Sequence, residues 1–328
     1  MEERQTGGNV LSAPSLLIVR FAAIGDCVMA AWTATAYRNQ YPGGNLVWAV
    51  DLRCRAVIDE TRLVSSVAEF PRDKWKANRW SPSTWREQLS AYAGLRKHHF
   101  DWGLDLQGHS KTALALRIAK PKRRVAVGAT DALAGRLNPM MPPCPEGTHT
   151  VDRNHIALQS FGEFTLPERP IMPDDAGTQR DPKLVTISVG AGSKAKMWVP
   201  ERWSAVATGM LSRGYDVILL GGPDDPRLEL PGATDLVAKI PLAETINWVA
   251  RSAVHLAADT GTGHMAAAYG VPVVSVFGPS DERRFRPFTQ MGRVLRGGPE
   301  TQSVSVEQVL AAADELLALT SKGKACVS

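Results

Sequence analysis

Three loops of this 328-residue chain combine glycines with charged or hydroxyl side chains, as a site that handles an anion and a proton requires. The first loop follows the apolar run 16–21 and ends in Gly25 and Asp26. A carboxylate in this place has two interpretations: it caps the helix that begins there, or it acts as a general base at the mouth of a cleft. Neither a GxGxxG pattern nor a Walker lysine accompanies the loop, which argues against a nucleotide site there.

The second loop, 188–200, is both glycine-rich and basic. Gly190 and Gly192 let backbone N–H groups approach an anion, and Lys194 and Lys196 add positive charge. The pattern suggests a phosphate-binding loop. The alternative is an exposed basic loop that holds no ligand.

The third loop, 258–266, runs from an apolar strand into an alanine-rich helix, and residues 261–266 match G-x-G-x-x-A. A dinucleotide site is disfavoured, because the match follows the third strong strand of its half and no acidic residue ends a strand about 20 residues later. The loop instead predicts a helix N-terminus that binds a diphosphate through its free N–H groups. His264 either bonds a phosphate or packs under the helix.

Regular elements must position these loops, and short apolar runs alternate with helical patterns along nearly the whole chain. Strands are predicted at 16–21, 46–50, 101–106, 124–127, 184–189, 217–220, 254–258 and 273–277. Helices are predicted at 28–40, 84–97, 111–119, 152–161, 201–213, 243–251, 263–269 and 304–319. Continuous apolar strands separated by helices indicate parallel sheets covered on both faces, so the predicted fold class is α/β.

A proline-rich, charged stretch without hydrophobic periodicity, 166–182, divides this pattern in two. It predicts a linker between an N-terminal domain, 1–165, and a C-terminal domain, 183–328, each doubly wound and Rossmann-like. In such sheets ligands bind beyond the carboxyl ends of the strands. All three loops follow predicted strands, so we expect them to face a cleft between the domains.

The composition excludes several classes of protein. With 44% hydrophobic and 22% charged residues, the chain is neither disordered nor collagen-like nor a coiled coil. No apolar run approaches the roughly 18 residues that span a bilayer. The opening Met1–Arg4 is polar, unlike a secretory signal peptide, and the four cysteines form neither CxxC pairs nor zinc spacings. These features predict a cytoplasmic protein without a metal site.

The net charge of +5 is unevenly distributed. Residues 1–163 hold 21 Lys and Arg against 15 Asp and Glu, whereas residues 164–328 hold 17 against 18. The first half therefore carries the positive excess and is expected to meet something anionic, although a merely soluble basic surface is the alternative. Nucleic acid is disfavoured, because no recognised binding motif accompanies the charge.

Taken together, the loops resemble those of glycosyltransferase family 9, the ADP-heptose:lipopolysaccharide heptosyltransferases. The matching elements, in family order, are Gly25-Asp26, Asp101–Gly108 with Lys111, His149–Arg153, Lys196–Pro200, Asp259–Gly261 with His264, and Phe277–Pro279. The resemblance spans residue 16 to about residue 288, which is most of the chain. It implies a GT-B fold, with the acceptor on the first domain and a nucleotide-sugar on the second.

The resemblance also implies an inverting, metal-independent transfer that needs no cofactor. Asp26 is similar to the family's catalytic base, and Lys196 is expected to neutralise the leaving diphosphate together with backbone amides. The expected donor-binding residues are Gly192, Ser193, Asp225, Asp259, Thr260, Gly261, Thr262 and His264. Asp225 is preferred over Asp224 as the ribose-binding carboxylate.

On the acceptor side, basic residues of the first half are interleaved with tryptophans. The expected acceptor-binding residues are Lys74, Lys111, His149 and Arg153. The resemblance implies that the basic face meets an anionic glycolipid of the Kdo-lipid A type. Basic residues with tryptophans also suit a peripheral contact with the cytoplasmic face of the inner membrane.

The leading hypothesis is transfer of heptose from ADP-L-glycero-D-manno-heptose to the inner core of lipopolysaccharide. The loop before Lys196 departs from the heptosyltransferase pattern at Gly192, Ser193 and Ala195. Another nucleotide-sugar or another acceptor is therefore the alternative. A sugar-nucleotide epimerase would share the architecture but would not need the basic first half. A catalytically silent nucleotide-sugar binder would not need Asp26.

Overall fold

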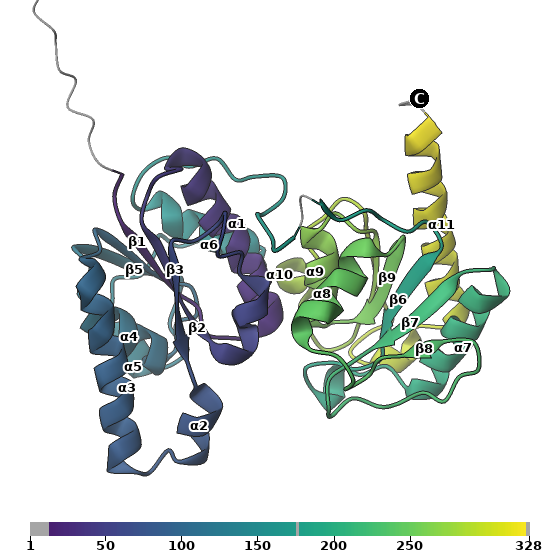
Figure 1. Ribbon diagram of the computed structural model, residues 1–328, viewed down its shortest axis with the longest axis horizontal. Helices are drawn as coiled ribbons and strands as arrows, with labels where there is room; N and C mark the ends of the chain where they lie inside the picture. The colour runs from purple at the N-terminus through teal and green to yellow at the C-terminus, as the bar shows by residue number, and fades with distance from the viewer. Residues whose placement is uncertain (1–12, 175–176, 326–328) are drawn as a thin grey trace, which may run out of the picture.

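The computed structural model describes residues 13–174 and 177–325, which form an α/β structure with two parallel sheets (Figure 1). The polar opening Met1–Arg4 and Cys326 lie outside the described residues. Each sheet lies in one half of the chain, and helices cover both of its faces. The predicted α/β class is confirmed.

The first sheet has the strand order β3-β2-β1-β4-β5, and all its pairs are parallel. Its strands are β1 (Leu16–Val19), β2 (Leu46–Asp51), β3 (Ser66–Phe70), β4 (Trp102–Asp105) and β5 (Arg123–Ala126). Its helices are α1 (Ile24–Gln40), α2 (Arg72–Ala77), α3 (Pro82–Gly94), α4 (Ser110–Ala119), α5 (Ala132–Leu137) and α6 (Thr150–Gln159). Two short 3-10 helices, η1 (Leu52–Val57) and η2 (Leu95–His98), follow β2 and α3.

The second sheet has the order β11-β10-β9-β6-β7-β8 and is also parallel throughout. Its strands are β6 (Leu184–Ser188), β7 (Asp216–Leu220), β8 (Thr234–Asp235), β9 (Val254–Ala258), β10 (Val273–Phe277) and β11 (Gly292–Arg296). Its helices are α7 (Pro200–Ser212), α8 (Leu242–Arg251), α9 (Gly261–Ala268), α10 (Glu282–Phe285) and α11 (Val306–Ala325). The 3-10 helices η4 (Lys194–Lys196) and η5 (Thr301–Ser303) precede α7 and α11.

In both sheets the strand order reverses beside the first strand, between β1 and β4 and between β6 and β9. At such a point the connections leave the sheet in opposite directions, so a crevice opens at the carboxyl ends of the two strands. The central strands β1, β6 and β9, which end at these crevices, are fully buried. The three glycine-containing loops, which end at Asp26 or span 188–200 and 258–266, begin at the ends of these three strands.

All eight predicted strands are present, each within two residues at either end. The strands β3, β8 and β11 were not predicted. Each of them lies at an outer edge of its sheet and pairs with one neighbour only. An edge strand has one open side and needs no continuous apolar run: β3 and β11 are mostly half-buried. Helix α1 begins four residues earlier than predicted, at Ile24.

The stretch 166–182 runs along both halves. The N–H of Ile171 donates to Oγ1 of Thr35 in α1 at 2.8 Å. The hydroxyl of Tyr269, which follows α9, donates to the carbonyl of Pro173 at 2.6 Å. Within the part of the chain that the structure describes, no helix is long and apolar enough to cross a membrane.

His255 in β9 gives the fold a dependence on pH. Its side chain is completely buried, Nδ1 lies 2.9 Å from Oγ1 of Thr186, and burial lowers its pKa to about 3. Between pH 6.5 and pH 3 the unfolded chain binds a proton that the folded chain does not bind. The free energy of unfolding therefore falls as the pH drops, by about 1.4 kcal/mol per pH unit for this group.

We predict that His255→Gln reduces the loss of unfolding free energy between pH 7 and pH 5, measured by urea denaturation at both pH values. The comparison is between slopes, so any destabilisation by the glutamine itself cancels. His109→Gln, which changes an exposed side chain, serves as the control and should keep the wild-type slope. An unchanged slope in His255→Gln would contradict the prediction.

Candidate active site

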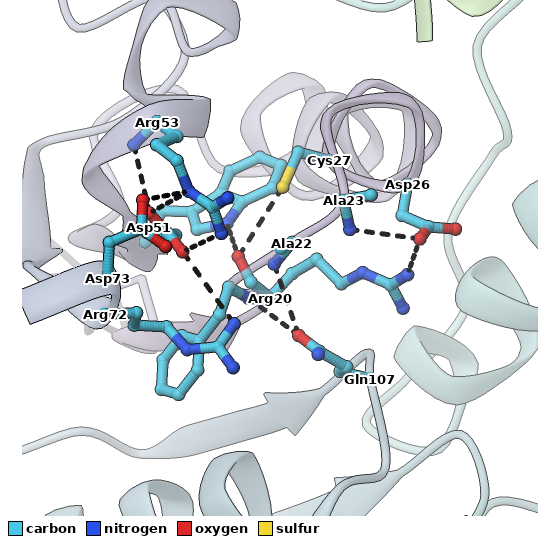
Figure 2. A network of polar contacts seen from close by, with 12 residues as sticks. Arg20, Ala22, Ala23, Asp26, Cys27, Asp51, Arg53, Arg72, Asp73 and Gln107 are labelled. Atoms are coloured by element: carbon cyan, nitrogen blue, oxygen red, sulfur yellow. Dashed lines mark hydrogen bonds and ion pairs between the residues drawn. The ribbon is translucent and has the colours of Figure 1, made fainter. Parts of the chain in front are cut away.

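Asp26 lies in the first turn of α1, directly beyond the carboxyl end of β1 (Figure 2). The N–H of Ala23 donates to its Oδ2 at 3.2 Å, so the carboxylate reaches back to the residue before the helix. Asp26 is the third residue of the helix and not the N-cap residue itself. Its side chain is 26% exposed, so the carboxylate keeps some access to solvent.

A buried arginine at the end of β1 holds this carboxylate. Nη2 of Arg20 lies 2.5 Å from Oδ2 of Asp26, and its Nη1 donates to the carbonyl oxygen of Leu106. Arg20 was not among the site residues predicted from the sequence. Its signal was present, because a charged residue at the end of a buried apolar run requires a partner.

The loop after β4 supports both residues. Oε1 of Gln107 accepts hydrogen bonds from the N–H groups of Phe21 and Ala22, at 3.0 and 3.3 Å (Figure 2). Buried Asp105 in turn accepts from the N–H groups of Gln107 and Gly108, at 3.0 and 2.9 Å. Burial raises the pKa of Asp105, and these bonds oppose that rise. The D-L-Q-G motif therefore braces the loop that carries the Arg20–Asp26 pair.

A second charged network begins at the end of β2. Buried Asp51 lies 2.9 Å from Nη2 of Arg53 and 3.9 Å from Nη1 of Arg72, and Asp73 lies 3.0 Å from Nε of Arg53 (Figure 2). Arg53 keeps 59% of its side chain exposed. Arg53 was not predicted as a site residue, because nothing in the local pattern of η1 distinguishes it from a surface residue.

Beside this network lies a small depression, here called the basic hollow. Its lining residues are Arg53, Arg72, Asp73, Trp75, Lys76, Gln88, Tyr92 and Lys111. The pKa of Lys111 is lowered by burial and by the nearby charges of Arg72, Arg79 and Lys76. Cations gathered closely enough to lower the pKa of this lysine also attract an anion to the space between them.

Of the four predicted acceptor residues, only Lys111 lines the basic hollow. Nζ of Lys74 is paired with Glu87 at 3.0 Å on the surface. Nδ1 of His149 accepts from the N–H of Val151 at 3.1 Å, which makes this ring a cap for α6.

The other nitrogen of His149 donates to the carbonyl of Arg286 at 2.8 Å, so this ring also joins the two halves of the chain. Arg153 donates to the carbonyl of Val127 at 3.0 Å and fastens the end of β5. In both residues the polar atoms serve the fold, and the structure offers no contact that would single them out for an acceptor.

A cavity of about 430 Å³ lies between the two halves of the chain. The first half contributes Ala23, Ile24, Gly25 and Arg53. The second half contributes Ser188, Gly190, Ala191, Gly192, Gly221, Gly222, Pro223, Asp225, Ile240, Leu242, Thr245, Thr260, Gly261, Thr262 and Met265. The cavity therefore extends from the N-terminus of α1 to the carboxyl ends of β6, β7 and β9.

The N-terminus of α9 opens onto this cavity. Thr260 is its N-cap residue and accepts from the N–H of Thr262 at 3.3 Å. The hydroxyl of Thr262 lies 2.7 Å from the hydroxyls of Thr260 and Ser188. Hydroxyl groups and free helix N–H groups in one place form a binding site for a phosphate group.

Lys196 lies in η4 and reaches the same loop. Its Nζ is 2.7 Å from Oδ2 of Asp259, which is buried directly before the N-cap of α9. The predicted cation and the predicted acidic residue are thus partners of one ion pair. An anion that enters beside α9 competes with Asp259 for this lysine.

The N-termini of α1 and α9 meet at two glycines. A Cβ atom added to Gly25 would lie 2.6 Å from Cδ2 of His264, and one added to Gly261 would lie 3.1 Å from Cγ2 of Ile24. His264 is buried beneath this contact. Burial lowers its pKa to about 4, against the opposing charges of Asp259 and Asp26, so the ring is neutral near pH 7.

Five of the predicted donor-binding residues line the cavity between the halves: Gly192, Asp225, Thr260, Gly261 and Thr262. Ser193 is exposed outside the lining, Lys196 and Asp259 pair with each other, and His264 packs under Gly25. Lining residues with polar side chains that were not predicted to bind the donor are Arg53, Ser188 and Thr245. Ser188 ends β6 and had a usable signal, because it stands where a ligand loop begins.

Among the described residues, no group of three or more His, Cys, Asp or Glu side chains could hold a metal ion. Cationic side chains and helix N–H groups of the kind described above can bind a phosphate group through charge-assisted hydrogen bonds.

Comparison with known proteins places this geometry in context. A family model described as glycosyltransferase family 9 (heptosyltransferase) matches residues 89–312. Lipopolysaccharide heptosyltransferase 1 of Pseudomonas aeruginosa is 26% identical over 284 residues, which are 81% of this chain and 79% of that protein.

Solved structures share the fold. The E. coli heptosyltransferase WaaC, solved with ADP, superposes with a TM-score of 0.77 at 19% identity, covering 92% of this chain and 99% of that one. TibC, a dodecameric iron-containing heptosyltransferase solved with ADP-D-beta-D-heptose, has a TM-score of 0.60 at 15% identity, covering 93% and 76%.

The glycine contact at the two helix N-termini generates a prediction. Gly25→Ala places a methyl group against the buried ring of His264, so we expect a loss of about 1–3 kcal/mol in the free energy of unfolding. Chemical denaturation measures this loss. Gly94→Ala is the matched control, because a Cβ there meets nothing within 4 Å, and it should leave stability unchanged or slightly higher. A Gly25→Ala variant as stable as the wild type would show that the contact is loose.

Proposed function

Because the chain belongs to glycosyltransferase family 9, the heptosyltransferase family, and has the GT-B fold, we propose that it transfers heptose from ADP-L-glycero-D-manno-heptose to the inner core of lipopolysaccharide. One observation carries the proposal. Residues 23–25, in the turn that holds Asp26, line the same cavity as the N-terminus of α9. The turn that ends at Asp26 and the N-terminus of α9 thus border one cavity.

The donor's diphosphate fits the N-terminus of α9. The free N–H groups and the hydroxyls of Thr260 and Thr262 can donate hydrogen bonds to its oxygens, and Lys196 can leave Asp259 to pair with the diphosphate. Asp225 supplies a carboxylate for the ribose at the far end of the cavity. A side chain at Gly190 would overlap this carboxylate, which explains the glycine in that loop.

In the proposed reaction the acceptor hydroxyl attacks the anomeric carbon from the side opposite the diphosphate. Asp26 takes the hydroxyl proton as the new carbon–oxygen bond forms. The bond from the anomeric carbon to the diphosphate breaks, and its electron pair leaves with the nucleotide diphosphate. The configuration at the anomeric carbon is therefore inverted.

Two groups of this chain act on charge rather than on covalent bonds. Arg20 fixes the orientation of the Asp26 carboxylate, because Nη2 of Arg20 lies 2.5 Å from Oδ2 of Asp26. Lys196 and the amides of α9 stabilise the negative charge that develops on the leaving diphosphate. We propose that they do so without a metal ion; one well-placed donor of this kind contributes about 3–4 kcal/mol to lowering the barrier.

The basic hollow suits the acceptor. Kdo-lipid A type glycolipids carry carboxylates and phosphates, and Arg72, Lys76 and Lys111 face the space where such a group can bind. Arg53 lines both the hollow and the donor cavity, so it lies between the two substrates. An acceptor anion held in the hollow therefore lies next to the donor cavity and the turn that carries Asp26.

The general-base assignment predicts that Asp26→Asn lowers the rate of transfer by about 10²–10⁴-fold, because the amide cannot take the proton. Binding of ADP should be unchanged, since the diphosphate contacts lie on α9. Steady-state transfer assays and calorimetry measure the two quantities separately. Asp216→Asn, on an exposed carboxylate of β7, is the control. Near-normal turnover by Asp26→Asn would refute the assignment.

The donor assignment predicts that ADP binds more tightly than UDP, GDP or NAD in calorimetric titrations of the purified protein. The titrations are run with EDTA present, so that a requirement for a metal ion would be exposed. Preference for UDP or GDP would retain glycosyl transfer and reject the heptose donor. Binding of NAD alone would mean that the G-x-G-x-x-A match at 261–266 marks a dinucleotide site, and the proposal would fall.

A further inference from the structure

The outer face of α3 and the turn before it carry an apolar surface that the proposed reaction does not use. Trp80, Trp85 and Leu89, here called the Trp80 patch, are 83%, 47% and 43% exposed. Together with Pro82 and Arg86 they line one shallow depression. Trp80 and Trp85 are the only tryptophans among the large hydrophobic side chains that are exposed in the described residues.

The patch stands in a strongly basic segment. Residues 72–97 contain seven Lys and Arg against two Asp and Glu, a net charge equal to that of the entire chain. Both acids are already in ion pairs, Asp73 with Arg53 and Glu87 with Lys74, each at 3.0 Å. The guanidinium of Arg79 lies 5.1 Å from the centre of the Trp80 ring, so cation and apolar surface are adjacent.

We infer that the Trp80 patch docks the protein on an anionic phospholipid surface. Exposed tryptophan and leucine side chains enter the interfacial region of a bilayer, and arginines and lysines around them pair with anionic headgroups. A protein partner would not require this excess of cations around the aromatic rings. The inference rests on the proposed function only in that the acceptor is a lipid.

The placement of the patch explains how a membrane-bound acceptor reaches the site. Helix α3 lines the basic hollow with Gln88 and Tyr92, while Trp85 and Leu89 point outward from the same helix. In Figure 1, α3 lies on the side of the first half that is far from the second sheet. Docking through α3 thus holds the hollow at the lipid surface and leaves the donor half in water.

The test is co-sedimentation of the full chain with vesicles of phosphatidylcholine, with and without phosphatidylglycerol. The wild type should bind the anionic vesicles and release partly at high salt. The double variant Trp80→Ser with Leu89→Ser should lower the partition coefficient by on the order of tenfold or more. Arg79→Gln with Arg86→Gln should remove the preference for phosphatidylglycerol. Leu133→Ser, on a leucine that is 54% exposed in α5, is the matched control and should bind like the wild type.

Two results would overturn the inference: wild-type protein that ignores anionic vesicles, or a Trp80 patch variant that binds them as the wild type does. A dimer in sedimentation velocity that Trp80→Ser dissociates would assign the patch to a second copy and also overturn it. Transfer to a delipidated, soluble acceptor distinguishes the two proposals. Vesicle binding without any transfer rejects the proposed function alone, and transfer without vesicle binding rejects the docking surface alone.

Discussion

The contact between the N-termini of α1 and α9 is the constraint on which the site depends. The N-terminus of a helix is its positive end, so two such ends in contact repel each other and attract anions. The two glycines allow the approach, and neutral His264 fills the space beneath it without adding charge. Asp26 and Asp259 supply negative charge on either side. The first N–H groups of the two helices, which have no hydrogen-bond partner within their own helix, are left at the edge of the cavity.

A series of hydrogen bonds within the first half holds Asp26 in place. Buried Asp105 holds the loop at Gln107, and that loop binds the backbone after β1. The carbonyl of Leu106, in the same loop, accepts from Arg20, which pairs with Asp26. A residue without access to the cavity thereby determines where the carboxylate points. Residues 105–107 thus have a structural role: they position the backbone after β1 and the side chain of Arg20, which pairs with Asp26.

Sequence reasoning succeeded where one residue pattern has one physical cause. Continuous apolar runs predicted the central strands, because both faces of those strands are buried. Five of the residues that are expected to bind the donor follow these strands and line the cavity, and their role stays a prediction. Sequence reasoning failed where partners come from distant segments. The sequence separates Arg20 from Leu106, and Arg53 from the donor loops, and only the folded sheets bring them together. His149 resembled a binding residue because a capping imidazole and a ligand imidazole have the same sequence signature.

The ion pair of Lys196 with Asp259 has a consequence for the rate of the cycle. An internal carboxylate that occupies the lysine before donor binding also stands ready when the nucleotide diphosphate departs. In the proposed reaction Asp259 therefore lowers the affinity for the spent nucleotide and hastens its dissociation. A site that bound diphosphate with an unopposed lysine would hold its product longer. Asp259 thus weakens the binding of the nucleotide diphosphate, and the enzyme returns sooner to its nucleotide-free state.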